Sequence, residues 1–395
     1  MKLGTDIPTG KDIVLSTDAL RRHLYIVGKS GTGKSVFLEH LALSLIEEGF
    51  GVCVLDPHGD LVEKIAHSIP DNRFWKDVLY WEPFDTSHVI GYNPLKDIPV
   101  ERRPLVTENI LSAFSHVWGL SNQHTPRLLH ILRNSIRLLL DNHDTSLIDL
   151  QRLLVSDFYR LDLLKHCTDY TVRTFWDDEY GKWNAKQRAE YIASLQNKIG
   201  ALVSNPAMRE ILSHDYLNPG TLMNKQRVLL ANLSKGKLGE ESSSLLGSLL
   251  TSGFSQAAHE RASIPEEHRK DFVLIIDEFQ NFTTTAFTGI LSEARKYRLS
   301  LIVAHQFMSQ LPQDLQDAVI GTANTLITFR VGARDAPILS AELDLDQPRQ
   351  LKNIPNYQAI LRTPDSPDVR HMATYPPRPP GKRLEAVRSR TRART

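Results

Sequence analysis

Apolar residues in the first hundred positions alternate between short runs of strand length and a longer stretch with a helical period. The short runs predict strands at 12–15, 23–27 and 51–55, and the longer stretch predicts a helix at 34–48. A second region of this kind starts near residue 226. Its apolar runs lack polar alternation, which is typical of a parallel sheet covered on both faces, and they predict strands at 227–231, 272–276, 300–304 and 324–329.

The segment between these two regions, residues 100–222, has a different pattern. Strand signals stop and helical periods dominate, most clearly at 105–118, 125–142 and 185–204. Because neither flanking region holds a complete sheet, we interpret the middle segment as an all-α domain inserted into one α/β domain. Two independent domains in series remain the alternative.

Composition places the chain among ordinary globular proteins. It has 395 residues, of which 41% are apolar, and no run of eighteen apolar residues occurs. The N-terminus lacks the charged and then apolar plan of a secretory signal, so we expect a cytoplasmic protein with no integral membrane segment. Cys53 and Cys167 lie far apart and are expected to be buried thiols.

The net charge of +1 conceals a basic C-terminus. Residues 376–395 carry seven Lys and Arg residues against Glu385, so the rest of the chain is net negative. With prolines and no apolar period, residues 366–395 are predicted to form a disordered basic tail. Such a tail can bind nucleic acid or an anionic membrane, or it can simply keep the chain in solution.

A phosphate-binding loop follows the predicted strand at 23–27 and precedes the predicted helix at 34–48. Its glycines let successive N–H groups face a phosphate, and the helix N-terminus favours the same anion. Lys34 is expected to bind the β- and γ-phosphates of ATP, and the Ser35 hydroxyl is expected to bind Mg²⁺. The complete motif is Gly28, Lys29, Ser30, Gly31, Thr32, Gly33, Lys34 and Ser35.

Two acids end the predicted strand at 272–276. Ligands gather at the carboxyl ends of parallel strands, so Asp277 is the candidate Mg²⁺ ligand and Glu278 the candidate that orients or deprotonates the attacking water. A water-activating acid favours hydrolysis over phosphate transfer to another substrate. The alternative is that both acids cap a helix or face solvent.

Two further polar residues are catalytic candidates. Gln306 follows the strand predicted at 300–304, where an amide can sense the γ-phosphate, although polar residues often end strands for no such reason. Arg295 precedes that strand and is the candidate that a neighbouring subunit would supply in trans to stabilise phosphoryl charge, with Arg330 as a weaker second candidate. His305 is expected to be a packed or surface imidazole.

These segments resemble the HerA/FtsK branch of ring motors, and within it the type IV secretion coupling proteins of the TraG/TraD type. The resemblance implies that Asp56 and His58, in an Asp-Pro-His-Gly-Asp run, lie near the phosphates. It also supports the hypothesis that Arg295 acts on the ATP of the adjacent subunit. The segments that carry it are HLYIVGKSGTGKS, VCVLDPHGDL, VIGYNPL, LSKGKLGEESSSLLGSLL, FVLIIDEFQNF, EARKYRLSLIVAHQ and NTLITFRVGARDA.

The resemblance implies a RecA-like P-loop core in two parts, residues 1–99 and 223–365, interrupted by the all-α domain at 100–222. It also implies a homo-oligomeric ring, expected to be a hexamer, that uses ATP and Mg²⁺ to pull DNA without sequence preference and that works with secretion-channel or DNA-processing proteins. Membrane-bound coupling proteins begin with transmembrane helices, whereas this chain reaches its phosphate loop at residue 28 and also has no room for a HerA-type N-terminal barrel. We therefore expect a soluble relative.

Three alternatives remain open at this point. One is a secretion ATPase that powers protein transfer or channel assembly without gripping DNA. Another is a HerA-like DNA-processing helicase, and the third is a nucleotide-gated switch with little turnover.

Overall fold

One mixed sheet organises the protein. In the computed structural model, which describes residues 1–74, 77–284, 286–379 and 381–394, the sheet has 11 strands in the order β2-β1-β11-β10-β9-β3-β8-β7-β4-β6-β5. The strands are β1 (Lys2–Asp6), β2 (Asp12–Val14), β3 (Leu24–Val27), β4 (Gly51–Asp56), β5 (Val78–Trp81), β6 (Val228–Asn232), β7 (Phe272–Ile276), β8 (Leu299–His305), β9 (Thr325–Thr328), β10 (Gln358–Thr363) and β11 (Ser366–Ala373).

The seven strands from β9 to β5 are parallel, and the remaining four pair antiparallel at the other end. Strand β8 lies between β3 and β7, so the segments that follow these three strands meet at one edge of the sheet. Alternate residues of a strand point to opposite faces. In β3, Tyr25 and Val27 join one apolar cluster, while Leu24 and Ile26 join a second cluster on the other face.

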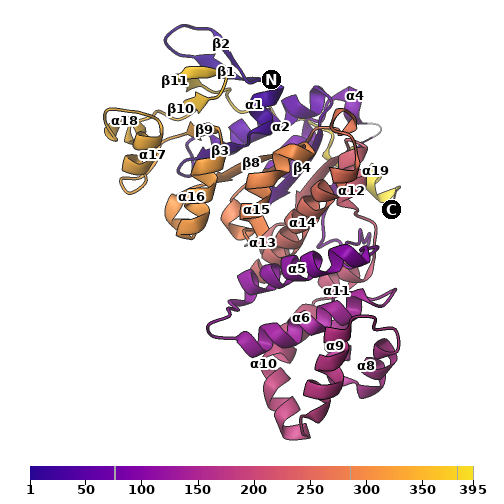
Figure 1. The fold of residues 1–395 in the computed structure, drawn as a ribbon. Coiled ribbons are helices and arrows are strands. Elements are labelled where there is room, and N and C mark those ends of the chain that lie inside the picture. The colour runs from indigo at the N-terminus through magenta and orange to yellow at the C-terminus, as the bar shows by residue number, and fades with distance from the viewer. Residues whose placement is uncertain (75–76, 285, 380, 395) are drawn as a thin grey trace.

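Helices cover both faces of the sheet, as the uninterrupted apolar strands require (Figure 1). Helices α2 and α3 bury apolar residues in the second cluster, whereas α14 and α15 bury theirs in the first. The helices around the sheet are α1 (Thr17–Arg21), α2 (Lys34–Glu47), α3 (Asp60–His67), α4 (Asp71–Phe74), α12 (Pro219–Asn224), α13 (Lys235–Leu238), α14 (Glu240–Glu260), α15 (Ala286–Glu293), α16 (Gln313–Thr322), α17 (Ala336–Glu342) and α18 (Arg349–Lys352).

Most of the chain between β5 and β6, from α5 to α11, forms the helical part that stands below the sheet in Figure 1. Because β6 pairs with both β4 and β5, the strands before and after this part belong to one sheet. The predicted α/β fold class, with an inserted all-α domain, is therefore confirmed. The helices are α5 (Arg103–Trp118), α6 (Pro126–Leu140), α7 (Asp149–Val155), α8 (Asp157–Leu164), α9 (Tyr170–Thr174), α10 (Ala185–Ser204) and α11 (Pro206–Ser213).

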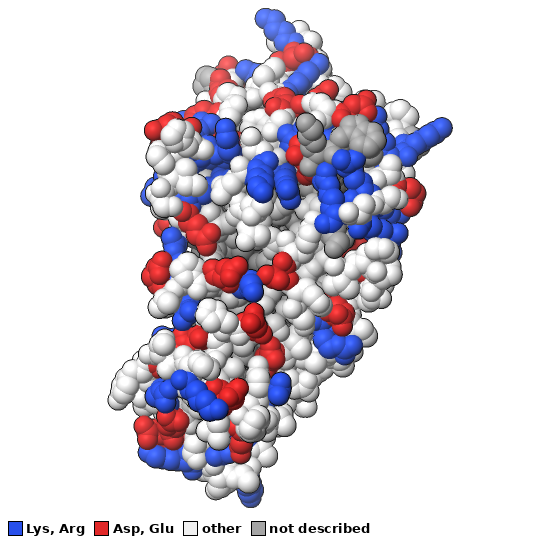
Figure 2. All heavy atoms as spheres, turned by 90° about the vertical axis from the view of Figure 1, so that its right-hand side faces the viewer, with Lys and Arg blue, Asp and Glu red and all other residues white. Residues whose placement is uncertain are grey.

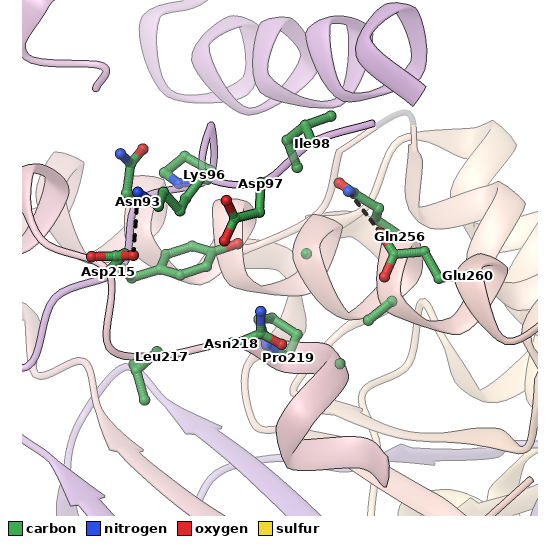
Figure 3. Close-up of a pocket in the computed structure, with 15 residues that line it drawn as sticks. Asn93, Lys96, Asp97, Ile98, Asp215, Leu217, Asn218, Pro219, Gln256 and Glu260 are labelled. Carbon is green, nitrogen blue, oxygen red and sulfur yellow. Dashed lines mark hydrogen bonds and ion pairs between the residues drawn. The ribbon is translucent and has the colours of Figure 1, made fainter. Parts of the chain in front are cut away.

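Two chain segments connect the helical part to the sheet. They are joined by backbone hydrogen bonds from Tyr92 N to Ile211 O at 2.8 Å and from Leu217 N to Gly91 O at 2.8 Å. A polar pocket lies beside this connection, where Lys96 faces Asp215 at 3.8 Å (Figure 3). None of the residues that line this pocket belongs to the predicted nucleotide site.

The prediction of a disordered tail at 366–395 is wrong for most of that segment. Residues 366–373 form β11 inside the antiparallel part of the sheet, and helix α19 (Leu384–Arg392) packs against β5 and α3. Two apolar residues, Leu384 and Val387, are buried there. Sequence reasoning missed this helix because its few apolar positions lie among charged residues.

Acids on the body of the protein pair with the arginines of α19. The guanidinium of Arg388 donates to both carboxylate oxygens of Glu82, at 2.8 and 2.9 Å. The Thr391 hydroxyl accepts the N–H of Tyr80 at 3.0 Å, on the edge strand β5. Figure 2 shows the side of the molecule that carries α19, with Lys and Arg side chains gathered in its upper half and acidic groups among them.

Candidate nucleotide site

The predicted phosphate loop runs from the end of β3 to the start of α2. Gly31 and Gly33 have φ angles of 76° and 109°, in the left-handed region that favours glycine. Gly33 is the N-cap of α2, and none of the described side chains caps this end of the helix. The first N–H groups of α2 therefore face the surface that an anion would occupy.

Backbone contacts with later segments hold the loop in place. Lys29 N donates to Arg330 O at 2.9 Å, and Tyr357 N donates to Thr32 O at 2.8 Å. The Thr32 hydroxyl closes the turn by donating to Lys29 O at 2.7 Å. A β-carbon on Gly28 would lie 2.5 Å from the β-carbon of Phe329, so the first glycine of the motif is needed for close approach to the segment after β9.

The structure brings four predicted residues together at the carboxyl edge of the sheet. The Lys34 ammonium donates to Glu278 Oε1 at 2.8 Å and lies 3.6 Å from Asp277 Oδ1. Gln306, which follows β8, donates from Nε2 to the same Glu278 oxygen at 2.9 Å. Lys34, Asp277 and Glu278 are each about 5% exposed, so neither acid is solvent-facing. Ser35, by contrast, is exposed at the first turn of α2.

Burial raises the pKa of both acids, and the nearby Lys34 ammonium lowers it. Burial raises the pKa of Asp277 to about 6, although the Lys34 charge works against this rise. Burial also opposes ionisation of Glu278, but there the charge and hydrogen bond of Lys34, with further hydrogen bonds from Gln280 and Gln306, leave the pKa below its usual value. Near neutral pH both acids are therefore ionised and share one ammonium. This surplus negative charge suits a divalent cation such as Mg²⁺.

Asp56 lies at the end of β4, beside β7, and its carboxylate accepts backbone N–H groups. The donors are His58 at 2.9 Å, Leu61 at 2.8 Å and Val62 at 3.2 Å, at the start of α3. These bonds order the Asp-Pro-His-Gly-Asp turn, and the charge of Asp56 contributes to the raised pKa of Asp277. His58 is exposed. A contact of Asp56 with nucleotide stays a prediction.

Among the described residues, no hydrogen bond or ion pair joins either arginine candidate to Asp277 or Glu278 of its own chain. Arg295 lies in a short 3-10 segment (Ala294–Tyr297), its side chain is 50% exposed, and it lies 3.5 Å from Asp18 on α1. An arginine that acts on a neighbouring subunit has to be accessible in this way, and its role stays a prediction. Arg330 lies beside the loop and donates to Asn356 Oδ1 at 3.0 Å.

His305 is a fully buried side chain hydrogen-bonded to the Tyr25 hydroxyl. Burial lowers its pKa to about 3, so it is neutral at physiological pH. Of the two predicted environments, packed or surface, the structure shows the packed one.

Sequence reasoning missed two residues that hold Glu278. Gln280 Nε2 donates to Glu278 Oε2 at 2.9 Å, and Asn281 Nδ2 donates to the Glu278 carbonyl at 2.7 Å. Asn281 also accepts from Lys235 Nζ at 2.7 Å and contacts His116 of α5 at 3.2 Å. Both residues fall in the FVLIIDEFQNF segment, so their position directly after Glu278 was the available signal.

The order of the parallel strands, the glycine loop at the N-terminus of α2 and the paired acids after β7 define the P-loop ATPase fold of the RecA-like class. Two family models match the sequence: "Helicase HerA, central domain" over residues 1–72 and "TraM recognition site of TraD and TraG" over residues 271–342. These matches confirm the resemblance drawn from the motifs. No curated protein sequence matches the chain.

Solved structures share the fold over nearly the whole chain. The unbound bacterial conjugative coupling protein TrwB is 15% identical, with a TM-score of 0.67 over 96% of this chain and 90% of that one. TrwB in complex with ADP and Mg²⁺ is 16% identical, with a TM-score of 0.66 over 93% and 88%. VirB4 of Thermoanaerobacter pseudethanolicus is 14% identical, with a TM-score of 0.65 over 95% and 96%. At these identities the likeness establishes the fold.

Proposed function

We propose that this chain is a Mg²⁺-dependent ATP hydrolase. The observation that carries the proposal is the contact of Lys34, at the phosphate loop, with Glu278 and, through Glu278, with Gln306. One site thus contains Lys34 to bind phosphate, Glu278 to activate water and Gln306 to sense the γ-phosphate. The complex of the similarly folded TrwB with ADP and Mg²⁺ supports this choice of ligand.

The residues have complementary roles in the proposed reaction. The loop N–H groups and Lys34 bind the phosphates, while Ser35 and Asp277 provide oxygen ligands for Mg²⁺. Bound Mg²⁺ would neutralise charge on the phosphates. Glu278, once Lys34 turns to the phosphates, is free to orient a water molecule and to accept its proton. Gln306 can then donate to the γ-phosphate, and its bond to Glu278 links the state of that phosphate to the base.

We further propose that the chain works as a homo-oligomeric ring, of six subunits in our preferred arrangement, that moves DNA. The match to the TraD and TraG model and the likeness to a conjugative coupling protein support this proposal. Arg295 is exposed and would act on the ATP of the neighbouring subunit. Contacts to DNA phosphates carry no base information, so little sequence preference is expected.

The segment after β6, which forms the short helix α13, is our candidate DNA contact. Its Lys235 is bonded to Asn281 and Glu240, and Lys237 Nζ lies 4.4 Å from the centroid of the Phe84 ring. A DNA phosphate that attracted Lys235 would break its hydrogen bond to Asn281. Because Asn281 also donates to the Glu278 carbonyl, this change would alter the contacts that position Glu278. DNA binding could in this way raise the rate of hydrolysis.

A secretion ATPase that powers protein transfer or channel assembly is the second candidate. The fold shared with VirB4 favours it, because that likeness covers 96% of VirB4. A HerA-like DNA-processing helicase would also use the core matched at residues 1–72.

In the structure's described residues, no helix combines the length and apolar character needed to cross a membrane.

ATP hydrolysis measured with and without DNA separates these functions. A DNA motor should hydrolyse ATP faster with single- or double-stranded DNA, the effect should weaken steeply with salt, and two unrelated sequences should stimulate equally. Robust hydrolysis that no DNA stimulates would favour the secretion ATPase. Absence of hydrolysis under every condition would contradict the proposed function as a whole.

A further inference from the structure

Two strained residues lie on opposite sides of the phosphate loop. Glu278 and Tyr357 have φ angles of 46° and 61°, in the left-handed region where a β-carbon approaches its own backbone too closely. Glu278 belongs to the proposed catalytic group. Tyr357 has no role in that group, although strain of this kind gathers at functional sites and persists only where the surroundings enforce it.

Hydrogen bonds on both sides of its backbone hold Tyr357 in this conformation. Its N–H donates to Thr32 O at 2.8 Å, inside the phosphate loop. Its carbonyl accepts from the N–H and the hydroxyl of Thr374, at 2.8 and 2.9 Å, at the end of β11. The residue is thus fixed between the loop and the antiparallel part of the sheet.

The Tyr357 ring lies directly against the loop. A β-carbon on Gly33 would come within 2.9 Å of ring atom Cδ1, so a larger residue at position 33 could not coexist with the ring. At the same time 38% of the residue remains exposed. An aromatic ring with one part packed on a phosphate loop and another open to solvent is suited to stacking on a flat ligand.

The topology indicates which part of the nucleotide lies there. The terminal phosphate has to lie near Glu278 and Gln306, which follow β7 and β8. Strand β9 is on the other side of β3, and Tyr357 immediately precedes β10, the next strand along. A nucleotide bound with its last phosphate at Glu278 therefore extends its nucleoside toward the side of Tyr357.

We propose that Tyr357 is the base-binding residue of the nucleotide site and that its ring stacks on the purine. This inference rests on the proposed nucleotide site. It assigns a contact for the base, which the phosphate loop does not contact. Stacking favours the larger purine ring system over a pyrimidine and tolerates either purine, since each has a π face. Asn356 directly precedes Tyr357 and accepts from Arg330 at 3.0 Å, and the Arg330 carbonyl in turn accepts the N–H of Lys29 in the loop.

Comparison of MgADP with Mg-pyrophosphate tests the proposal, because only ADP carries a base. The variant is Tyr357→Gly, since glycine adopts the same φ without strain and should preserve the loop. By calorimetric titration we expect MgADP to bind about fivefold more weakly or worse, as loss of one base–aromatic stack implies, with pyrophosphate changed by less than about twofold. Tyr357→Phe should retain wild-type binding of both.

The control is Tyr216→Ala, which removes a tyrosine of the same 38% exposure remote from the loop and should change neither affinity. Equal loss of ADP and pyrophosphate in Tyr357→Gly would mean that the ring only props the loop, and no loss of either would mean that it does not touch the ligand. Both results overturn the proposal. Wild-type protein that binds neither ligand would overturn the nucleotide site itself, whereas binding of both without hydrolysis would contradict only the proposed ATPase.

Discussion

The ammonium of Lys34 and the carboxylate of Glu278 form a buried ion pair with an N–O distance of 2.8 Å. Lys34 begins α2, and Glu278 follows β7, 244 positions later. The pair neutralises charges that would be costly to bury alone. It also means that Lys34 has to exchange one anionic partner for another when it binds phosphate.

Removal of Lys34 should therefore affect stability as well as ligand binding. Lys34→Met leaves Asp277 and Glu278 buried without their cation, so we expect the free energy of unfolding in urea to fall by about 3 kcal/mol. The double variant Lys34→Met/Glu278→Gln should recover part of this loss, because the uncompensated acid is gone. A single variant as stable as the wild type would show that the pair contributes nothing to folding.

Replacement of Glu278 by glutamine separates binding from chemistry. Glu278→Gln keeps the size of the side chain and its contact with Gln306 but removes the base, so we expect kcat to fall about a hundredfold or more with nucleotide affinity retained. Glu267→Gln, at an exposed position, is the matched control and should behave as wild type. Unchanged turnover in Glu278→Gln would exclude this residue as the base, whereas negligible turnover in both the wild type and the variant would favour a nucleotide-gated switch.

Mixing of inactive subunits tests an arginine supplied in trans. Arg295→Ala and Lys34→Ala subunits should each be inactive alone, yet a mixture should regain part of the ATPase rate because some interfaces pair an intact loop with an intact arginine. Lys296→Ala, the exposed neighbour, should retain activity by itself. If mixed assemblies form, as sizing would show, and no activity returns, Arg295 does not act across the interface.

Acid should destabilise the protein through His23. This buried ring accepts the Leu301 N–H at Nδ1, at 3.0 Å, and Nε2 lies 3.1 Å from Leu291 O, an arrangement that suits the neutral imidazole. Burial lowers its pKa from 6.5 to about 4. Between these pH values the unfolded chain binds a proton that the folded chain does not, so stability falls as pH falls, by up to about 1.4 kcal/mol per pH unit.

Asp277 has the opposite effect, because its pKa is raised from 3.8 to about 6 and the folded chain binds the extra proton. The comparison of wild type with His23→Gln isolates the histidine, since glutamine can accept and donate the same two hydrogen bonds. The difference in unfolding free energy between these proteins should change with pH between 6.5 and 4. A constant difference would contradict a neutral His23.

The central strands could be predicted from sequence because both of their faces are buried. Strands β3, β4, β6, β7, β8 and β9 are buried along their whole length and consist mainly of apolar residues, and the order of their carboxyl ends brings Lys34 and Glu278 together. Strands β1, β5, β10 and β11 were missed. Strand β5 has only four residues, and the other three mix polar and apolar residues, with Gly4 in β1 and Pro367 in β11. In addition, β1 pairs with β11 across almost the full length of the chain.

The residues that hold the phosphate loop and Glu278 in place could be predicted less well than the motif residues themselves. Tyr357 contacts Thr32 from a loop that no local pattern marks, and Asn281 joins Lys235 and His116 through contacts between distant segments. Such contacts depend on how elements pack, and a single sequence contains no direct signal for them. The basic C-terminus was misjudged for the same reason, since Glu82, which accepts two hydrogen bonds from Arg388, lies 306 residues earlier.

The position of α19 has a consequence for assembly. An unprotected outer strand invites pairing with a strand of another molecule, which is a common route to aggregation. Here the Thr391 hydroxyl accepts the N–H of Tyr80 on the outer strand β5, so this N–H is not available to another strand. The outer strand at the opposite edge of the sheet, β2, is only three residues long. Copies of this protein are thus discouraged from fusing their sheets, and any ordered complex would have to be built through helices and loops.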